Sequence, residues 1–212
     1  DGAVVQMMMA EQKGANIAYN WIHDTKKYGI RMDGPAGGTN EGRNATVHHN
    51  VLWNVSAGLM VKGDYHSTYN NTIFGEDFDK NNIIVLYENG FGNENSLTEF
   101  NAADRIAAHR TGSYGNYPVP GDYNESNNFN GYTDDGGSVE SQLSDPYNYD
   151  FRAKNSSVIY NRSVGAYGIN DDWVAGMTWH FMGPELPFEG CMDTDAMNYN
   201  EEAIFSDNSC VY

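Results

Sequence analysis

The sequence predicts an all-β protein, a right-handed parallel β-helix in which the chain winds through successive coils. Three observations predict this fold. Helical periodicity is nearly absent, Asn, Gly, Asp and Tyr are abundant, and short β-branched runs recur around aligned asparagines. The recurring segments are NIAYNWIHD, TVHHNVLWN and STYNNTIFG, which begin at Asn16, Thr46 and Ser67. Units of this irregular length fit the coils of a solenoid better than the blades of a propeller.

The aligned asparagines are expected to stack at one turn of every coil. Side-chain amides in register hydrogen-bond from coil to coil and satisfy turn backbone that would otherwise be buried unpaired. Asn also tolerates the left-handed backbone conformation. The predicted ladder consists of Asn20, Asn50, Asn71, Asn101 and Asn127. Two positions later, an aliphatic residue is expected to point inside and form a second ladder, made of Ile22, Leu52 and Ile73.

The segment SLTEFNAADRIAAHR, from Ser96, has two interpretations. It could be a short helix, or a further coil that keeps the ladder spacing at Asn101, and we prefer the coil. The chain is then expected to have three parts: coils over residues 1–170, a cap or linker over 171–189, and a module over 190–212. The opening DGAVVQMMMAEQ has no initiator Met and no signal-peptide pattern, so we expect a piece of a longer chain.

The composition of the chain limits the classes of partner and the compartment that we expect. The chain has 29 acidic and 12 basic residues and a formal net charge of −17, which argues against nucleic acid and anionic lipid surfaces. No apolar run approaches the roughly 18 to 20 residues that cross a bilayer, so we expect no membrane span. Two cysteines, Cys191 and Cys210, predict a disulfide and an oxidising compartment outside the cytoplasm. Glycosylation sequons occur at Asn44, Asn54, Asn70, Asn124, Asn155 and Asn161.

Longer stretches resemble a known family. GIRMDGPAGGTNEGRNATVHHNVLWN and GLMVKGDYHSTYNNTIFG resemble the coils of secreted right-handed β-helix proteins of the pectate-lyase-like superfamily. DPYNYDFRAKNSSVIYNRSVGAYG, from Asp145, is similar to their closing coil, with an Asp-Phe-Arg strand, a Ser-rich turn and a Gly-Ala-Tyr strand. GCMDTDAMNYNEEAIFSDNSCVY, from Gly190, resembles a short Cys-bounded module near the C-termini of secreted and surface proteins of marine microbes.

The resemblance implies a chemistry for the coils. Lyases of this superfamily abstract a proton next to a uronate carboxylate with a Lys or Arg base, and Ca²⁺ held by carboxylates often neutralises the substrate acid. Here RMDG aligns with MVKG, which predicts that Asp33 lies beside Lys62 on the next coil. Arg31 lies two residues before Asp33 and therefore on the same face of the strand.

These residues can be read in two ways. In the functional interpretation Lys62 is the base, and the carboxylates hold substrate or a cation. In the alternative, Asp33 and Lys62 form an exposed cross-strand pair contributing about 0.2–1 kcal/mol, and His49 stacks with Tyr19. The predicted site comprises catalytic residues Lys62, His49 and His66 and substrate-binding residues Arg31, Asp33 and Asp64.

Other carboxylates offer weaker signals. The pairs Asp134–Asp135 and Asp171–Asp172 could serve an inverting hydrolase, but turn-like surroundings favour solvated turns. The C-terminal module could hold a weak Ca²⁺ site, or it could be a turn-rich loop fixed by its disulfide. The candidate metal ligands are Asp193, Asp195 and Asp207.

The sequence therefore predicts a secreted β-helix that acts on or binds acidic polysaccharide, as a lyase or a glycoside hydrolase. The alternative is a non-catalytic extracellular structural or surface glycoprotein. Its partners would be cell-surface or matrix components, and it would self-associate into filaments or be anchored at the cell surface. Fold alone does not decide between these functions.

Overall fold

The computed structural model describes residues 2–34, 42–75, 82–86, 93–108 and 124–167, and parts of the C-terminal segment (189–190, 194, 196–198, 205–206 and 210–212). The chain divides into two compact units, Asp1–Asp171 and Asp172–Tyr212. The predicted boundaries after residues 170 and 189 stay predictions.

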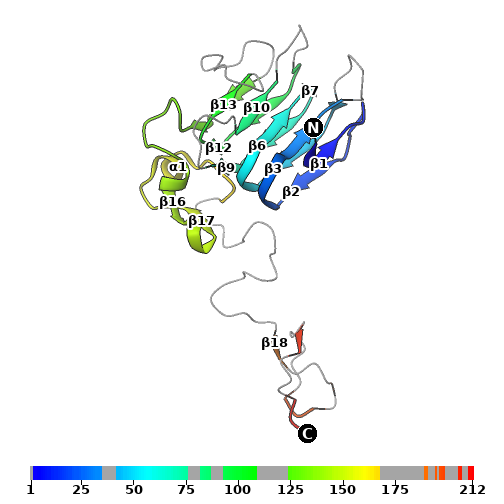
Figure 1. The fold of residues 1–212 in the computed structure, drawn as a ribbon, viewed down its shortest axis with the longest axis vertical. Coiled ribbons are helices and arrows are strands. Elements are labelled where there is room, and N and C mark those ends of the chain that lie inside the picture. The colour runs from blue at the N-terminus through cyan, green and yellow to red at the C-terminus, as the bar shows by residue number, and fades with distance from the viewer. Residues whose placement is uncertain are drawn as a thin grey trace. The chain divides into compact units, whose positions relative to one another are not determined.

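The first unit contains two parallel sheets whose strands stack coil upon coil (Figure 1). The strands of the large sheet are β1 (Ala3–Met7), β3 (Trp21–Met32), β6 (Val51–Val61), β9 (Thr72–Phe74), β10 (Ile83–Val85), β12 (Ala102–Ala103), β13 (Ile106–Ala107) and β15 (Phe129–Asn130). Those of the second sheet are β2 (Asn16–Ala18), β5 (Thr46–His48), β8 (Ser67–Tyr69), β11 (Leu97–Glu99) and β14 (Asn124–Ser126). A short parallel pair joins β4 (Gly42–Arg43) to β7 (Gly63–Asp64). This architecture confirms the predicted parallel β-helix.

The large sheet turns a corner in the middle of its two longest strands. Asp24 in β3 and Asn54 in β6 have φ values of 54° and 48°, in the left-handed region that short polar side chains tolerate. The register between these strands shifts just after this point, between Thr25 and Tyr28. We call the part before the corner the proximal face (the starts of β3 and β6, with β9, β12 and β15). The part after it is the distal face (the ends of β3 and β6, with β1, β10 and β13).

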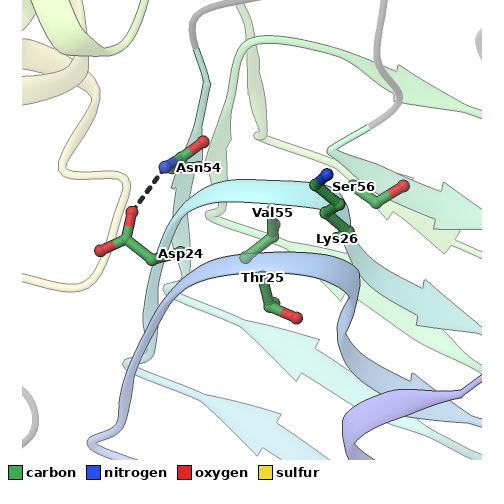
Figure 2. A pocket seen from close by; sticks show the side chains of 6 residues that line it. All are labelled: Asp24, Thr25, Lys26, Asn54, Val55 and Ser56. Carbon is green, nitrogen blue, oxygen red and sulfur yellow. Dashed lines mark hydrogen bonds between the residues drawn. The ribbon is translucent and has the colours of Figure 1, made fainter.

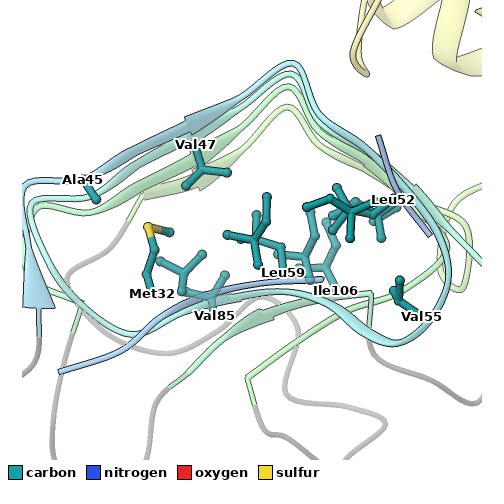
Figure 3. Packing of buried hydrophobic residues seen from close by; sticks show 14 of the residues in the cluster. Met32, Ala45, Val47, Leu52, Val55, Leu59, Val85 and Ile106 are labelled. Carbon is teal, nitrogen blue, oxygen red and sulfur yellow. The ribbon is translucent and has the colours of Figure 1, made fainter. Parts of the chain in front are cut away.

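The core fills the space that the coils enclose. Figure 3 shows Val47 pointing inward from one side and Leu59 and Val85 from the other. The strand register aligns inward residues from coil to coil, and burial of each aliphatic side chain contributes about 1.5–3 kcal/mol. One such row consists of Val5, Ile30, Leu59, Ile83 and Ile106. The register also aligns Ile22, Leu52 and Ile73, which confirms the predicted aliphatic ladder.

The asparagine ladder runs through five coils, with each amide Nδ2 donating to the next Oδ1 at 2.9 Å. Its members are Asn20, Asn50, Asn71, Asn101 and Asn128. The last rung is therefore Asn128, and the prediction of Asn127 was wrong by one residue.

The error has a physical reason, because the left-handed conformation belongs to the residue before each ladder asparagine. Five such residues have φ between 49° and 60°: Tyr19, His49, Asn70, Phe100 and Asn127. The ladder asparagines themselves contribute hydrogen bonds and not a left-handed backbone. Residues 97–107 form β11, β12 and β13, which confirms a further coil in place of a helix.

Residues 131–167 form a flap that follows the last coil. Its elements are η1 (Glu140–Gln142), β16 (Leu143–Asp145), η2 (Pro146–Asn148), β17 (Asp150–Ala153) and the helix α1 (Val158–Arg162). The predicted Asp-Phe-Arg strand is confirmed as part of β17, which pairs antiparallel with β16. The Ser-rich segment begins α1, because Ser157 Oγ accepts a hydrogen bond from Tyr160 N at 3.2 Å.

The predicted Gly-Ala-Tyr strand at residues 165–167 was wrong. This segment forms no strand and instead bonds to two different coils. Gly165 N donates to Phe100 O at 2.9 Å, and Ala166 N donates to Thr72 Oγ1 at 2.8 Å. The flap also covers aromatic residues of the proximal face. Phe151 lies 4.7 Å from Trp53, measured between ring centroids, so the flap is packed onto the solenoid.

In the second unit, β18 (Glu189–Gly190) pairs in parallel with β19 (Phe205–Ser206). The described residues include no free cysteine. The predicted disulfide between Cys191 and Cys210 stays a prediction, because Cys191 lies outside the described residues. The candidate ligands Asp193, Asp195 and Asp207 lie outside them as well. Among the described residues, no helix is long and apolar enough to cross a membrane.

Candidate functional site

Three charged side chains meet where β3 and β6 end on the distal face. The parallel register pairs Met32 with Val61, so the next residues, Asp33 and Lys62, are neighbours. Lys62 Nζ donates to Asp33 Oδ1 at 3.2 Å, and Arg31 Nη2 lies 2.7 Å from Asp33 Oδ2. The predicted alignment of RMDG with MVKG is thereby confirmed. We call Arg31, Asp33 and Lys62 the charge cluster.

The charge cluster is held firmly and is mostly covered. The side chains of its members are 11% to 21% exposed, so the ion pairs are screened less than surface pairs. Asp33 Oδ1 also accepts from Gly34 N at 3.0 Å, and Gln12 Nε2 donates to the backbone O of Asp33 at 2.7 Å. Asp33 and Lys62 are therefore mostly covered, unlike the exposed cross-strand pair of the alternative interpretation.

The cluster carries two cations and one anion, so its formal charge is positive. Arg31 Nε is buried and has no hydrogen-bond partner among the described residues. The Arg31 guanidinium lies 5.5 Å from the ring centroid of Tyr28, where the aromatic face favours a cation. An excess of positive charge suits the binding of a carboxylate.

The charge cluster borders a buried apolar cluster of the distal face. Register places Arg31 in one row with Met60 and Ile84, both of which are fully buried. Together with Ala57 and Leu86 they form an apolar cluster against which Tyr28 packs. Low local polarity strengthens the electrostatic interactions of the adjacent charges.

His66 stabilises the turn backbone and is not exposed to solvent. Its ring is fully buried, Nδ1 accepts from Ala45 N at 3.1 Å, and Nε2 lies 3.2 Å from Lys62 O. These partners require the neutral tautomer with its proton on Nε2. Burial lowers the pKa of His66, which agrees with a neutral ring. The imidazole therefore joins the turn backbone and presents no surface to a substrate.

His49 lies at the asparagine-ladder corner, before β6, whereas Lys62 follows the eleven residues of that strand. Its ring stacks on Tyr19 with centroids 5.4 Å apart, which confirms the expected stack. Its Nδ1 lies 2.7 Å from His48 Nδ1. The structure thus does not bring His49 together with the charge cluster.

Asp64 ties two coils together. Its Oδ1 accepts from Glu94 N at 2.9 Å, and its backbone O accepts from Asn44 N at 3.2 Å. Among the described residues, its carboxylate forms no hydrogen bond or ion pair with the charge cluster. Its carboxylate therefore serves the solenoid backbone in this arrangement.

The described residues do not fit a calcium site. None of them forms a group of three or more His, Cys, Asp or Glu side chains placed to hold a metal ion. At the charge cluster, the carboxylate of Asp33 is already engaged by two cations. Of the candidate hydrolase pairs, Asp134 binds Arg162 at 2.7 Å, and Asp171–Asp172 lies outside the described residues.

The sequons differ in their surroundings. The amides of Asn44, Asn54 and Asn70 already donate hydrogen bonds within the protein, to Glu11, Asp24 and Gly165. Asn155 and Asn161 are exposed. The side chain of Asn124 lies outside the described residues.

The sequence did not identify the groups that support the charge cluster. Gln12 comes from an earlier turn, and nothing in its neighbourhood predicts that it binds the backbone of Asp33. Tyr28 gave a weak signal, because it occupies the place of Ala57 in the alignment of YGIRMDG with AGLMVKG. Positions where one repeat carries a larger side chain than its neighbour are therefore informative.

Comparisons with known proteins agree with the fold. The chain is 32% identical over 119 residues to Pectate lyase 2 of Pectobacterium atrosepticum, and the aligned region covers 52% of this chain and 30% of that protein. It is 35% identical over 92 residues to Pectate lyase 2 of Pectobacterium carotovorum, covering 41% and 23%. These similarities support a pectate-lyase-like β-helix. The chain spans less than a third of the length of these curated relatives. No family model and no solved structure matches it.

Proposed function

We propose that this chain acts on acidic polysaccharide in a lyase-like manner, with the charge cluster as the place where a uronate carboxylate binds. The observation that carries the proposal is the pairing of Arg31 and Lys62 around one carboxylate, at the edge of the distal face. The similarity to two pectate lyases supports the substrate class. A location outside the cell belongs to the proposal and rests on the two cysteines of the sequence.

In the proposed reaction, Arg31 pairs with the substrate carboxylate and the deprotonated amine of Lys62 acts as the base. Lys62 takes the proton from the carbon next to the carboxylate. The electron pair of that C–H bond forms a C=C bond to the neighbouring carbon, and the bond from that carbon to the glycosidic oxygen breaks. The leaving oxygen takes a proton from water.

The geometry sets one condition on this reaction. Lys62 Nζ now donates a hydrogen bond to Asp33, whereas a base must offer a lone pair. Entry of the substrate must therefore separate Lys62 from Asp33. His66 and His49 have no part in the proposed step, because one is buried and the other lies at the opposite end of β6.

The test is incubation of the protein with polygalacturonate, alginate and sulfated algal polysaccharides, with added Ca²⁺ and with a chelator. An unsaturated uronate product, which absorbs in the ultraviolet, is the expected result. Lys62→Ala should lower the rate by about a hundredfold or more, whereas Lys154→Ala, an exposed lysine of the flap, should leave it unchanged. Absence of both product and binding across the panel would overturn the proposal. No observation in the described residues favours the alternative of a structural glycoprotein.

A further inference from the structure

A pocket lies between the flap and the corner of the large sheet, away from the charge cluster. Its volume is about 260 Å³. The solenoid contributes Asp24, Trp53 and Asn54 to its lining, and the flap contributes Glu140, Tyr147 and Tyr149. Pockets that combine aromatic walls with a few polar groups are typical of small-ligand sites.

The aromatic walls present flat, exposed faces. Tyr147 is 85% exposed and Tyr149 is 49% exposed, and both lie on the short turn around η2. Tyr149 has a φ of 63°, a strained backbone conformation for a bulky residue, and such strain gathers at functional sites. Trp53 lies in the pocket wall, and its ring is fixed by stacking on His23 with centroids 4.2 Å apart. The ring of Trp53 is thus held in place before a ligand arrives.

The polar groups of the pocket are hydrogen-bonding and acidic. Asn54 Nδ2 donates to Asp24, and His23 Nδ1 lies 2.7 Å from the same carboxylate. The hydrogen bond from His23 holds the pKa of Asp24 below its ordinary value, so this carboxylate is charged at neutral pH. Glu140 adds a second carboxylate from the flap.

A second pocket continues the first along the corner. It has a volume of about 540 Å³ and shares Asp24 and Asn54 with the aromatic pocket. Figure 2 shows these two residues facing each other from adjacent strands, with Lys26 and Ser56 farther along. We call these two adjoining pockets the groove: one is aromatic, and the other is lined by hydroxyl, amide and amine groups.

We propose that this groove binds a neutral oligosaccharide. Sugar rings have C–H faces that pack on aromatic rings, and their hydroxyl groups bond to carboxylates, amides and amines. Two adjoining pockets offer more than one place for a sugar ring, which favours a chain of sugars. Two carboxylates at the aromatic end repel a uronate, so this ligand differs in charge from the one proposed for the charge cluster. The site is independent of the uronate chemistry proposed above.

The test is calorimetric titration of the full chain with cello-, xylo- and galacto-oligosaccharides and with an oligogalacturonate of the same length. At least one neutral series should bind. Tyr147→Ala should raise its Kd about tenfold, because truncation of a central aromatic contact typically has this effect. The ring of Tyr147 projects to solvent, so the variant keeps its fold.

Tyr65→Ala is the matched control, since this tyrosine is 46% exposed on a turn that lines neither pocket. It should leave the Kd within about twofold of wild type. Lys62→Ala should also leave neutral binding unchanged, which separates this test from that of the lyase proposal. The proposal is overturned if no neutral series binds, if both tyrosine variants weaken binding equally, or if oligogalacturonate is the sugar that Tyr147→Ala releases.

Discussion

The two ends of β6 differ in the residues that align with them on neighbouring coils. At its start, Asn50 belongs to a column in which every coil has the same residue, and each amide bonds to the next. At its end, Lys62 follows Val61 in a column whose neighbours are Asp33 and Leu86. A column of identical, mutually bonded side chains is what the fold itself requires. A column whose members differ is not dictated by the fold and is free to carry function.

The largest expected effect tests the repeated column. Asn71 Oδ1 accepts from both Asn50 N and Asn50 Nδ2, and its own amide donates to Asn101 Oδ1. Asn71→Ala removes the acceptor of Asn50 N and the amide that donates to Val47 O. Because these groups are buried, the free energy of unfolding should fall by roughly 3–5 kcal/mol. Urea denaturation measures this loss.

The matched control for that variant is Asn20→Ala, at the end of the ladder. Asn50 Oδ1 still accepts from Asn20 N there, so the expected loss is about 1 kcal/mol. Equal losses at both positions would show that the ladder does not act coil by coil.

The comparison is sharpened by Asp104, a carboxylate outside both columns. It is 1% exposed and accepts hydrogen bonds from Val139 N and Gly75 N, which link the flap to the solenoid. Burial raises the pKa of Asp104 to about 6 from 3.8, despite these two bonds. The folded protein therefore holds this proton more tightly than the unfolded chain does.

The sign of the pH dependence follows from that pKa. The contribution of the proton is complete below about pH 4 and is lost as pH rises through about 6, amounting to roughly 3 kcal/mol. Asp104→Asn cannot ionise. The free energy of unfolding of wild type minus that of the variant should therefore fall between pH 4 and pH 7. A flat difference across urea titrations at several pH values would contradict the assignment.

The smallest effect is expected at the left-handed position of the ladder corner. His49→Asn keeps a residue that tolerates its φ of 52° and loses the ring contacts of His49 with Tyr19 and His48. Unfolding should change by less than about 1 kcal/mol, and turnover of any substrate should be unaffected. A large loss of turnover at unchanged stability would instead return His49 to the catalytic residues.

Much of the solenoid could be predicted because a repeat fixes its own register. Once NIAYNWIHD, TVHHNVLWN and STYNNTIFG are aligned, the asparagine ladder, the aliphatic ladder and the contact between Asp33 and Lys62 follow. The last rung was misplaced because NESNNFNG offers two adjacent asparagines, and only the backbone distinguishes Asn127 from Asn128.

Features made by tertiary packing could not be predicted in this way. Trp53 and Tyr147 meet at one pocket although 94 residues separate them, and no repeat relates the flap to the coils. His66 appeared to be a surface residue because it follows Lys62 and Asp64 in a charged stretch. In the structure its buried ring forms hydrogen bonds with Ala45 N and Lys62 O, and no sequence pattern indicates these contacts.

The central claim is that the non-repeating charges at the end of β6 bind a uronate. Its most direct test is titration of wild type and Lys62→Ala with a short oligogalacturonate, alongside urea denaturation of both. The account predicts that the variant binds at least about tenfold more weakly while its unfolding free energy falls by no more than about 2 kcal/mol, because Arg31 still pairs with Asp33. Unchanged affinity would contradict the claim, as would a stability loss as large as that of Asn71→Ala, because Lys62 would then belong to the scaffold.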